Sequence, residues 1–596
     1  MPQWVPKRSL AEVEAILTGP GALHEVEQRV IHNKIMRTYK NAWSSLRDFW
    51  MWAVEQHSDK TYIVFERTRV TFSEGLHRSA VIAAMLQDLY DIQKGDRVSI
   101  VSRNTADYLL TFWACHLIGA VPVLVNAWLP LEPTFHCIVK AGSKLVIMDG
   151  QRADSLEGAI QSIKAKIGTE AFLVWEEHEG KGTWPGMSSW TDVYRDYGGD
   201  HTRILKTSPN IYPEDNACIM FTSGTTGLPK GVLNTQRMYI TNILNVFVGG
   251  LRATLRRGDS ISASPPAGPQ KGLLISVPFF HVTGTTTLSS LATMAGYKIC
   301  LIRKWVPEEG RLSCGCLIIR QENVAVAGGV PSMVSDLVIS SAAGYPLDTL
   351  LFGGASPPDW LARDSMKAFP TAMMSQGYGL TETNSIAVAV AGEDYACRPT
   401  CAGLPSPVNE VAIVKGDKVL PPGELGEVWL RGPNVMKEYW DEPAATAKAL
   451  TADGWLRSGD IGYLDDEGFL YIRDRIKDLI IRGGENIDST TVENAASADS
   501  RLLEVAAVGV PDSRLGELVT VVAYTKPEFS GKVDEAEVIE IASQRLPKFA
   551  VPVMVMFLSE PLPRNAPGKI LKNVLRPIAK AEWERRRVTQ LSKNKL

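Results

Sequence analysis

The sequence predicts an α/β protein with a large N-terminal domain of parallel-rich sheets covered by helices, a β-barrel-like subdomain and a small C-terminal α+β domain. From about residue 61, short apolar runs bounded by Gly, Pro and Asn alternate with helical stretches. Such runs are typical of parallel strands that are buried on both faces. After residue 400 the pattern changes to hairpin-like strands, and a shorter βα-type segment follows. We place the domain boundary at the charged stretch RDRIKD, residues 473–478.

The elements of the large domain follow from these runs. A helix is expected over 107–121, where DYLLTFWACHLIGAV is long and apolar. Residues 253–270, rich in Pro, Ser and Gly, are expected to form a surface loop. Hairpin strands are expected at 426–432 and 462–475, since Asp-Asp-Glu-Gly is a turn signal. Strands are expected at 97–102, 122–126, 144–150, 217–222, 273–279, 298–303, 324–329 and 349–354.

Residues 31–53 are expected to form an amphipathic helix. Apolar residues recur at Ile35, Tyr39, Trp43, Leu46 and Trp50, with basic residues between them. Most such helices dock on a protein core, which is the interpretation that we favour. A basic amphipathic helix can also lie on a membrane surface, so peripheral membrane contact remains an alternative.

Composition excludes several classes of protein. The 596 residues carry a net charge of −3, so no electrostatic attraction to nucleic acid is expected. Eight cysteines in so long a chain are expected to be reduced thiols, without the second ligand pair that a zinc site needs. The most apolar region, 109–131, is interrupted by His116, Pro122 and Asn126 and predicts no transmembrane segment.

The two ends of the sequence bear on localisation. The N-terminus lacks the apolar core of a secretory signal. The last three residues are Asn-Lys-Leu, which departs from the peroxisomal address Ser-Lys-Leu in the first position. We therefore expect a cytoplasmic or peroxisomal protein, and the sequence indicates no oligomeric state.

Residues 221–232, FTSGTTGLPKGV, follow the apolar run ACIMF and are rich in glycine and hydroxyl groups. The segment fails the P-loop pattern, because Gly231 and Val232 follow Lys230 and no Gly-Lys-Ser/Thr is present. A loop that leaves a strand end is nevertheless the place where open α/β sheets bind ligands. Its hydroxyls, its backbone N–H groups and Lys230 could therefore surround a pyrophosphate.

Three further segments follow this loop in order: SQGYGLTET (375–383), GWLRSGD (454–460) and PLPRNAPGKI (561–570). With these four segments the chain resembles the AMP-forming adenylating enzymes, which include acyl- and aryl-CoA synthetases, luciferases and the adenylation domains of peptide synthetases. The resemblance covers roughly residues 45–575. It implies ATP, Mg²⁺, CoA and a small-molecule carboxylic acid as the cofactor and substrates.

The resemblance also assigns a nucleotide site. Glu382, with Thr222, would bind Mg²⁺, which prefers oxygen ligands. Thr381 would donate to the α-phosphate, while Asp460 and Arg475 would bind the ribose. Tyr378 would stack on adenine, and the base would be lined by Gly353, Gly354, Ala355, Gln376 and Gly377, while Gly379 would also belong to the ATP/AMP site. The leaving β- and γ-phosphates would be held by Thr222, Ser223, Gly224, Thr225, Thr226, Gly227 and Lys230.

The same resemblance implies that the C-terminal domain is mobile. Lys569 would bridge the carboxylate and the α-phosphate while charge builds on the phosphate oxygens. The domain, residues 479–596, would then rotate relative to residues 1–473 about a hinge at 474–478, with Lys477 as the hinge residue. Gly483 and Gly484 would line a tunnel for the pantetheine arm of CoA.

The acid pocket is less well defined by the sequence. The segment VPFFHVTGTTT (277–287) resembles the family segment whose histidine lies beside the incoming carboxylate. His281 is not expected to act as a base, since a carboxylate nucleophile has no proton to lose at neutral pH. Gly284 and Gly354 would leave room for a bulky or extended acyl group. The pocket is expected to comprise Phe280, His281, Val282, Thr283, Gly284 and Gly354.

These predictions together describe an ATP-dependent acid–thiol ligase that makes acyl-CoA through acyl-AMP, with Lys569, His281, Thr381 and Glu382 as catalytic residues. A medium- or long-chain fatty acid is the first choice of substrate, and an arylpropenoic or other metabolite acid is the second. An enzyme that transfers the adenylate to a carrier protein is an alternative. A non-catalytic nucleotide-binding protein is a further alternative, which the four motifs together disfavour.

Overall fold

The computed structural model describes residues 4–31, 33–222, 228–261, 268–303, 305, 314–354, 357, 359–475, 477–482, 485–565 and 568–593. The chain divides into two compact units. The first comprises Met1–Ala355, Leu361–Val411 and Leu430–Leu456. The second comprises Ser356–Trp360, Ala412–Trp429 and Arg457–Leu596.

The first sheet of the first unit is mostly parallel. Its strands β6, β5, β7 and β8 run parallel, and β10 extends them on one side with the antiparallel partner β11. Strands β6 and β7 are buried along their whole length, as expected for a sheet covered on both faces. The order is β22 (Glu438–Tyr439), β11 (Lys230–Thr235), β10 (Asn216–Thr222), β6 (Val121–Leu124), β5 (Arg97–Val101), β7 (Leu145–Asp149), β8 (Ala171–Trp175) and β9 (Ser188–Ser189).

The second sheet of this unit is parallel in its centre and antiparallel at its edges. Strands β3, β13, β12, β14, β15 and β16 are parallel neighbours, while β17 and β4 pair antiparallel. The order is β18 (Leu404–Pro405), β17 (Ser385–Ala391), β16 (Met373–Leu380), β15 (Thr349–Gly353), β14 (Val324–Gly329), β12 (Gly272–Ile275), β13 (Lys298–Leu301), β3 (Thr61–Phe65) and β4 (Thr68–Thr71).

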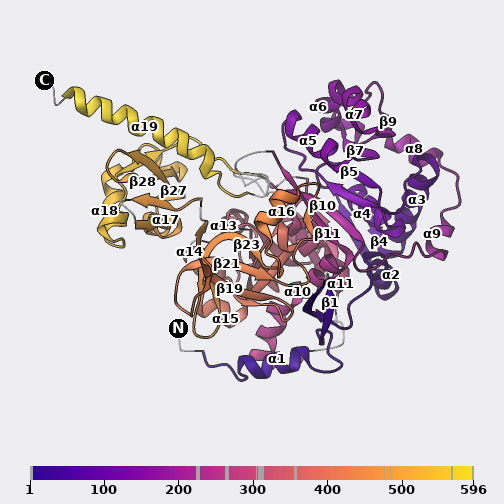
Figure 1. The fold of residues 1–596 in the computed structure, drawn as a ribbon, viewed down its shortest axis with the longest axis horizontal. Helices are drawn as coiled ribbons and strands as arrows, with labels where there is room; N and C mark the ends of the chain where they lie inside the picture. Colours follow the sequence, from indigo (N-terminus) through magenta and orange to yellow (C-terminus); the bar gives the residue numbers. More distant parts are fainter. Residues whose placement is uncertain are drawn as a thin grey trace. The chain divides into compact units, whose positions relative to one another are not determined.

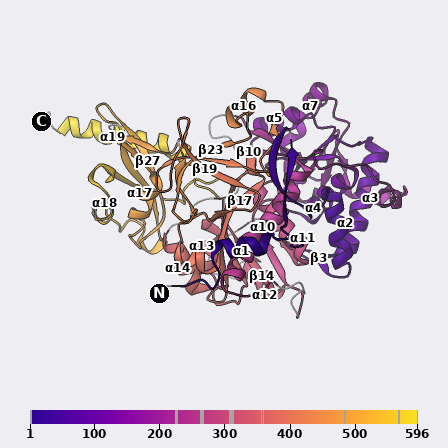
Figure 2. The same cartoon turned by 60° about the horizontal axis from the view of Figure 1, so that its bottom comes forward.

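Helices cover both sheets. On one side α2 (Leu46–His57), α3 (Phe72–Tyr90) and α4 (Ala106–Ile118) pack together, as Figure 2 shows. Helix α4 begins after the N-cap Thr105 and ends at Gly119, whose φ of 74° suits glycine. Residues of α5 (Leu131–Ala141), α6 (Gly150–Leu156) and α7 (Ile160–Ile167) share a buried cluster with the first sheet. The predicted parallel-rich, helix-covered domain is therefore confirmed.

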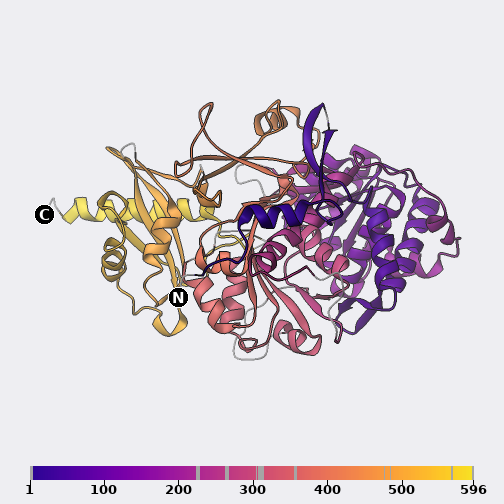
Figure 3. The ribbon, with the colours of Figure 1, turned by 90° about the horizontal axis from the view of Figure 1, so that it is seen from below.

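The predicted helix over 31–53 is wrong in its first half. Lys34–Tyr39 forms strand β2, which pairs with β1 (Val26–Ile31) in a separate antiparallel ribbon, visible in Figure 3. The residues Lys34 to Tyr39 do not alternate polar and apolar side chains strictly, so the strand period is weak in the sequence and the helical spacing stood out. Helix α2 begins at Leu46 after the N-cap Ser45, whose side chain accepts from the backbone of Asp48.

The predicted surface loop over 253–270 is wrong in its first four residues. Helix α10 (Gln236–Arg256) continues through them, and Ala253, Leu255 and Arg256 are buried. Arg256 resembles a surface residue in the sequence, but it forms a buried ion pair with Asp394 at 3.0 Å. Residues 262–267 of the predicted loop lie outside the described residues.

The third sheet follows in the order β20 (Lys418–Val419), β19 (Glu410–Lys415), β21 (Gly426–Arg431), β23 (Leu456–Leu464) and β24 (Leu470–Arg475). Its β23–β24 hairpin matches the prediction, with Asp465 accepting from the backbone of Glu467 and Phe469 in the turn. Within the described ranges β20 and β24 do not pair with each other, so the barrel-like subdomain is an open sheet.

The C-terminal part of the second unit is an α+β domain, shown in yellow in Figure 1. Its sheet runs in the order β26 (Glu485–Ile487), β25 (Ile480–Arg482), β28 (Gly516–Thr525) and β27 (Leu502–Asp512), and β29 (Met554–Phe557) also pairs with β28. Alternate residues of β27 face opposite sides, as a strand requires. Ala507 packs with α17 (Ser489–Ala496) and α18 (Glu535–Ser543), whereas Ala506 packs with α19 (Lys572–Lys593). No helix among the described residues is long and apolar enough to cross a membrane.

Candidate active site

The predicted phosphate loop is closed by a β-hairpin. Thr222 ends β10 and Lys230 begins β11, and the two residues are register partners. The hydroxyl of Thr222 donates to the carbonyl oxygen of Lys230 at 3.5 Å. A P-loop would lead into a helix, whereas this loop leads into a strand. Ser223, Gly224, Thr225, Thr226 and Gly227 lie outside the described residues, so their phosphate contacts remain a prediction.

A short segment brings this hairpin to Glu382. The backbone N–H of Met436 donates to the carbonyl oxygen of Glu382 at 2.7 Å, and that of Trp440 donates to Gly231 at 2.7 Å. Between them, the phenol of Tyr439 donates to Oε1 of Glu382 at 2.6 Å. The ammonium of Lys230 lies 5.2 Å from the centroid of the Tyr439 ring. The structure thus brings the predicted metal ligand and the predicted phosphate lysine to the same tyrosine.

Tyr439 was not identified from the sequence. It lies in a two-residue strand whose partner, β11, is remote in the chain, and no catalytic pattern surrounds it. Burial, and then the carboxylate of Glu382, raise the pKa of Tyr439 well above its ordinary value. The phenol therefore stays protonated and keeps its hydrogen bond to the carboxylate.

The predicted adenine-binding residues lie at the carboxyl ends of β15 and β16. Gly353 and Gly377 are register partners there, and Gln376 and Tyr378 project from the same face of β16. Gln376 is buried. At Gly379 a Cβ atom would lie 1.6 Å from the carbonyl oxygen of Ser385, so only glycine fits.

The chain then enters a short 3₁₀ turn, Thr381–Thr383, which presents Thr381 and Glu382 directly after the strand. Gly354 has a φ of 78°, in the left-handed region that favours glycine. Ala355 lies outside the described residues.

The predicted ribose-binding pair lies in the second unit. Asp460 and Arg475 are register partners in β23 and β24, with 3.2 Å between Oδ1 of Asp460 and Nε of Arg475. Asp460 is buried, and its backbone N–H donates to the hydroxyl of Ser458 at 3.0 Å. Asp460 and Arg475 are separated in the sequence by the hairpin turn, and the register of the hairpin brings them side by side.

Lys569 is electrostatically coupled to this pair. Burial lowers the pKa of Lys569 to about 8, with Arg475 acting in the same direction and Asp460 opposing it. The lysine is half-buried. A lysine with such a pKa is close to its titration point at neutral pH, which is typical of functional sites.

The loop that carries Lys569 is braced by its own side chains. Asn565 exchanges two hydrogen bonds with Lys569: its Oδ1 accepts from the lysine N–H at 2.7 Å, and its N–H donates to the lysine carbonyl at 2.8 Å. Arg564 donates to the carbonyl of Gly568 at 2.6 Å and to Glu504 at 2.9 Å. Residues 566 and 567 lie outside the described residues. Arg564 and Asn565 were not identified from the sequence, although they precede the lysine within the same motif.

The predicted hinge and tunnel are described in part. Burial lowers the pKa of Lys477, and Arg475 acts in the same direction. The carbonyl of Lys477 accepts from Arg576 at 2.7 Å. Residue 476 and the predicted tunnel residues Gly483 and Gly484 lie outside the described residues.

The predicted acid segment is held by a buried asparagine. The amide of Asn104 accepts from the N–H of Phe279 at 2.8 Å and donates to the carbonyl of Val277 at 3.0 Å. Burial lowers the pKa of His281 to about 4. Its Nδ1 accepts from the N–H of Thr283 at 3.3 Å, which agrees with a neutral ring. The histidine is therefore neutral at physiological pH, and its contact with the acid stays a prediction.

The small residues of this segment have backbone explanations. A Cβ at Gly284 would lie 2.2 Å from the carbonyl oxygen of Pro278, so the close backbone approach requires glycine. Val282 is buried, and the ring of Phe280 makes an edge contact with Trp128 at 5.1 Å. Gly284 therefore has a backbone reason to be glycine, and the room that Gly284 and Gly354 would leave for an acyl group stays a prediction.

The donor set around Glu382 fits Mg²⁺ rather than a metal with an all-protein cage. Among the residues that the structure describes, no group of three or more His, Cys, Asp or Glu side chains could hold an ion. Mg²⁺ commonly takes one or two carboxylates and completes its shell with phosphate and water oxygens. Glu382 beside the phosphate hairpin offers that arrangement.

Two family models match the chain. The model described as AMP-binding enzyme matches residues 50–440, and that described as AMP-binding enzyme C-terminal domain matches residues 491–569. The long-chain-fatty-acid–CoA ligase FadD13 of Mycobacterium tuberculosis is 30% identical over 489 residues, 81% of this chain and 88% of that protein. The 2-succinylbenzoate–CoA ligase of Bacillus velezensis is 30% identical over 528 residues, 88% of this chain and 96% of that protein.

Solved structures agree with these matches. The o-succinylbenzoate CoA synthetase of Bacillus subtilis, in complex with the acyl-adenylate intermediate OSB-AMP, has a TM-score of 0.72 at 26% identity, covering 89% of this chain and 98% of that one. ATP-bound MatB from Rhodopseudomonas palustris has a TM-score of 0.73 at 25% identity, covering 90% and 99%. From these matches we conclude that the chain belongs to the AMP-binding enzyme family, including that family's C-terminal domain.

Proposed function

We propose that the chain is an ATP-dependent acid–thiol ligase that forms an acyl-CoA through an acyl-adenylate. In the first half-reaction a carboxylate oxygen of the acid bonds to the α-phosphorus of ATP, and the bond to pyrophosphate breaks. In the second, the thiol sulfur of CoA bonds to the acyl carbon, the bond to AMP breaks and the thiol proton passes to solvent. The names of the related CoA ligases support this reaction.

The observation that carries the proposal is the contact of Tyr439 with both Glu382 and Lys230. It joins a carboxylate suited to Mg²⁺ with a cation suited to the departing phosphates. Mg²⁺ held by Glu382, with Thr222 on the hairpin, would neutralise charge on the phosphate oxygens. Lys569 would supply the second positive charge, because a flexible ammonium suits a group that has to approach and withdraw.

The acid is proposed to be a medium- or long-chain fatty acid. The similarity to FadD13, whose name specifies long-chain fatty acids, supports this choice. The similarity to 2-succinylbenzoate–CoA ligases supports an aryl acid as the alternative.

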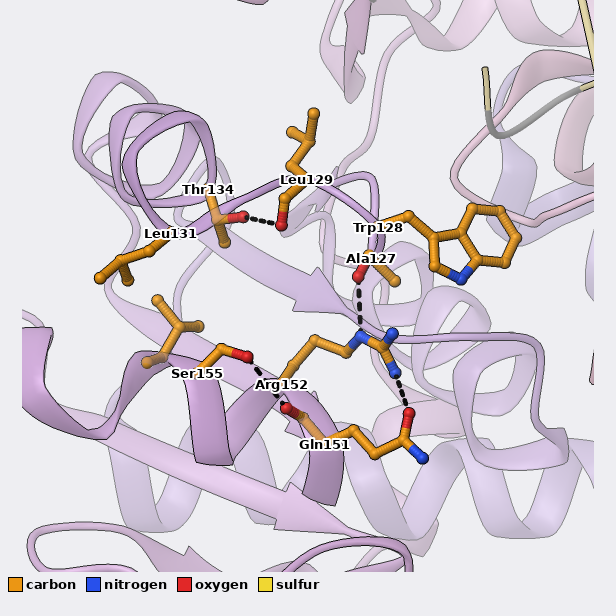
Figure 4. Close-up of a pocket in the computed structure, with 9 residues that line it drawn as sticks. Ala127, Trp128, Leu129, Leu131, Thr134, Gln151, Arg152 and Ser155 are labelled. Carbon is orange, nitrogen blue, oxygen red and sulfur yellow. Dashed lines mark hydrogen bonds between the residues drawn. The ribbon is translucent and has the colours of Figure 1, made fainter. Parts of the chain in front are cut away.

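A cavity of about 230 Å³ in the first unit supports CoA, rather than a carrier protein, as the acceptor (Figure 4). The indole of Trp128 is 38% exposed and can stack on a base. The guanidinium of Arg152 is fixed by the carbonyl of Ala127 at 2.7 Å and by Asp149 at 3.1 Å. The exposed ring of Trp128 suits the base of CoA, whereas the charge of Arg152 is paired with the buried Asp149.

The test is pyrophosphate exchange and AMP release over a panel of fatty and aryl acids, each with and without CoA. The ligase predicts exchange with at least one acid and AMP release that requires CoA. Exchange without thioester formation would favour transfer to a carrier protein. Absence of exchange with every acid would leave the non-catalytic nucleotide-binding protein as the better hypothesis.

A further inference from the structure

Helix α19 begins three residues after Lys569 and contacts the hinge directly. Lys572 and Arg576, one turn apart on this helix, make the contacts. The ammonium of Lys572 lies 2.6 Å from Oε1 of Glu493 in α17 and also donates to the hydroxyl of Ser489. Arg576 donates to the carbonyl of Lys477 at 2.7 Å and pairs with Asp478 at 2.9 Å.

One further side-chain contact spans the hinge, beside the backbone hydrogen bonds that Asp478 and Leu479 donate to the carbonyl oxygen of Arg475. Oδ2 of Asp474 accepts from both the backbone N–H and the hydroxyl of Ser489, each at 2.6 Å. Both residues are buried. A buried carboxylate with charge-assisted hydrogen bonds is held firmly in one position. The contacts form a continuous chain from Lys572 through Ser489 to Asp474.

The contacts near the hinge are of two kinds: in some, both partners follow Lys477 in the sequence, and in the other, the partners lie on opposite sides of Lys477. Lys572–Glu493 and Arg576–Asp478 have both partners after the hinge residue, so a rotation about Lys477 would move them as one body. Asp474 precedes the hinge residue, whereas Ser489 follows it. The Asp474–Ser489 contact is therefore the one in this network that a large rotation has to break.

We propose that Asp474, Ser489 and Lys572 form a hinge latch that holds Lys569 in position for adenylation and opens for thioester formation. The latch fixes the start of α19, and hence the Lys569 loop, relative to Asp460 and Arg475. Asp474 and Ser489 are positioning residues, since they act on the reaction through Lys569. This inference rests on the proposed two-step function.

The test compares Asp474→Asn and Ser489→Ala with the wild-type full-length chain in both half-reactions. Dodecanoic acid, or the preferred acid of the panel, serves for pyrophosphate exchange, and the corresponding synthetic acyl-AMP with CoA serves for thioester formation. The latch predicts that exchange falls ~10- to 100-fold, because the lysine loses its position, while thioester formation stays near wild type. Equal loss of both half-reactions, or no loss of exchange, would overturn it.

A second measurement reads the hinge without turnover. Brief trypsin digestion, followed by mass spectrometry, reports how often residues 473–478 open. The latch predicts faster cleavage confined to these residues in both variants. Unchanged cleavage, or cleavage spread over the whole domain, contradicts the latch. If no acid is activated but hinge cleavage accelerates, the proposed function fails, while the Asp474–Ser489 contact is still shown to restrain the hinge.

Asp465→Asn is the matched control for both measurements. Its carboxylate accepts from the backbone of Glu467 at 3.0 Å and of Phe469 at 2.9 Å, so it also binds two donors in the same unit. Both of its partners precede the hinge residue. We expect wild-type half-reactions and wild-type hinge cleavage from this variant, and a latch-like phenotype would contradict the proposal.

Discussion

The phenol of Tyr439 donates a hydrogen bond to Glu382, with 2.6 Å between Oη and Oε1. The same ring lies 5.2 Å from the ammonium of Lys230. Since the pKa of Tyr439 is raised by burial and then by the carboxylate, the phenol remains a donor. The tyrosine therefore orients the carboxylate that we propose as the magnesium ligand.

Tyr439→Phe should weaken magnesium dependence rather than abolish turnover. Loss of a hydrogen bond to a metal-binding carboxylate typically lowers metal affinity ~10- to 100-fold. We expect the Mg²⁺ concentration for half-maximal pyrophosphate exchange to rise about tenfold, with the rate recovering at saturating Mg²⁺. Tyr212→Phe, at an exposed tyrosine, is the control. An unchanged magnesium titration would show that Tyr439 does not orient Glu382.

The pH dependence of adenylation should report Lys569. Its pKa is lowered to about 8, so the lysine is charged below this pH and loses its charge above it. The value of kcat/KM for pyrophosphate exchange, which reports the free enzyme, should therefore fall as pH rises through about 8. In Lys569→Arg the residual activity should lack this decline, because arginine stays protonated. The same decline in both proteins would assign it to another group.

Acid should destabilise the first unit through His116. The ring is fully buried, and neither nitrogen has a hydrogen-bond partner within the described residues. Burial lowers its pKa from 6.5 to about 3. The unfolded state thus binds the proton first, so stability is full above pH 6.5 and is lost as pH falls towards 3. At pH 5 the loss is about 2 kcal/mol.

His116→Leu should remove this acid sensitivity. The thermal unfolding midpoint of the variant should change less between pH 7 and pH 5 than that of the wild type. The lower pH lies about 1.5 units below the ordinary pKa of histidine, so the unfolded chain is protonated there. His178→Gln, at an exposed histidine, is the control. An identical midpoint shift in His116→Leu and wild type would show that His116 does not contribute.

The strands of the large domain could be predicted because strands that are buried on both faces consist of uninterrupted apolar residues. Strands β5 to β8 are short apolar runs, and the turn at Asp465 has ordinary turn chemistry. The ribbon of β1 and β2 could not be predicted in the same way. Apolar side chains at Ile35 and Tyr39 fit helical spacing, and it is the pairing with the preceding strand β1 that decides between the two periods.

In the candidate site, residues within short sequence motifs could be predicted, whereas residues placed by tertiary contacts could not. Glu382, Asp460 and Lys569 lie in local motifs, so the sequence indicates them. Tyr439 reaches Glu382 only through strand pairing between β11 and β22. The backbone reason for Gly284, its close approach to the carbonyl oxygen of Pro278, could be recognised only in the structure.

The measurement that tests the account most directly is Lys569→Ala in the two half-reactions. The variant should lose pyrophosphate exchange, since the cation that bridges the reacting groups is absent, and should still form the thioester from supplied acyl-AMP and CoA. Equal loss of both half-reactions would contradict an adenylation-specific lysine. Retention of exchange would contradict the proposed mechanism itself.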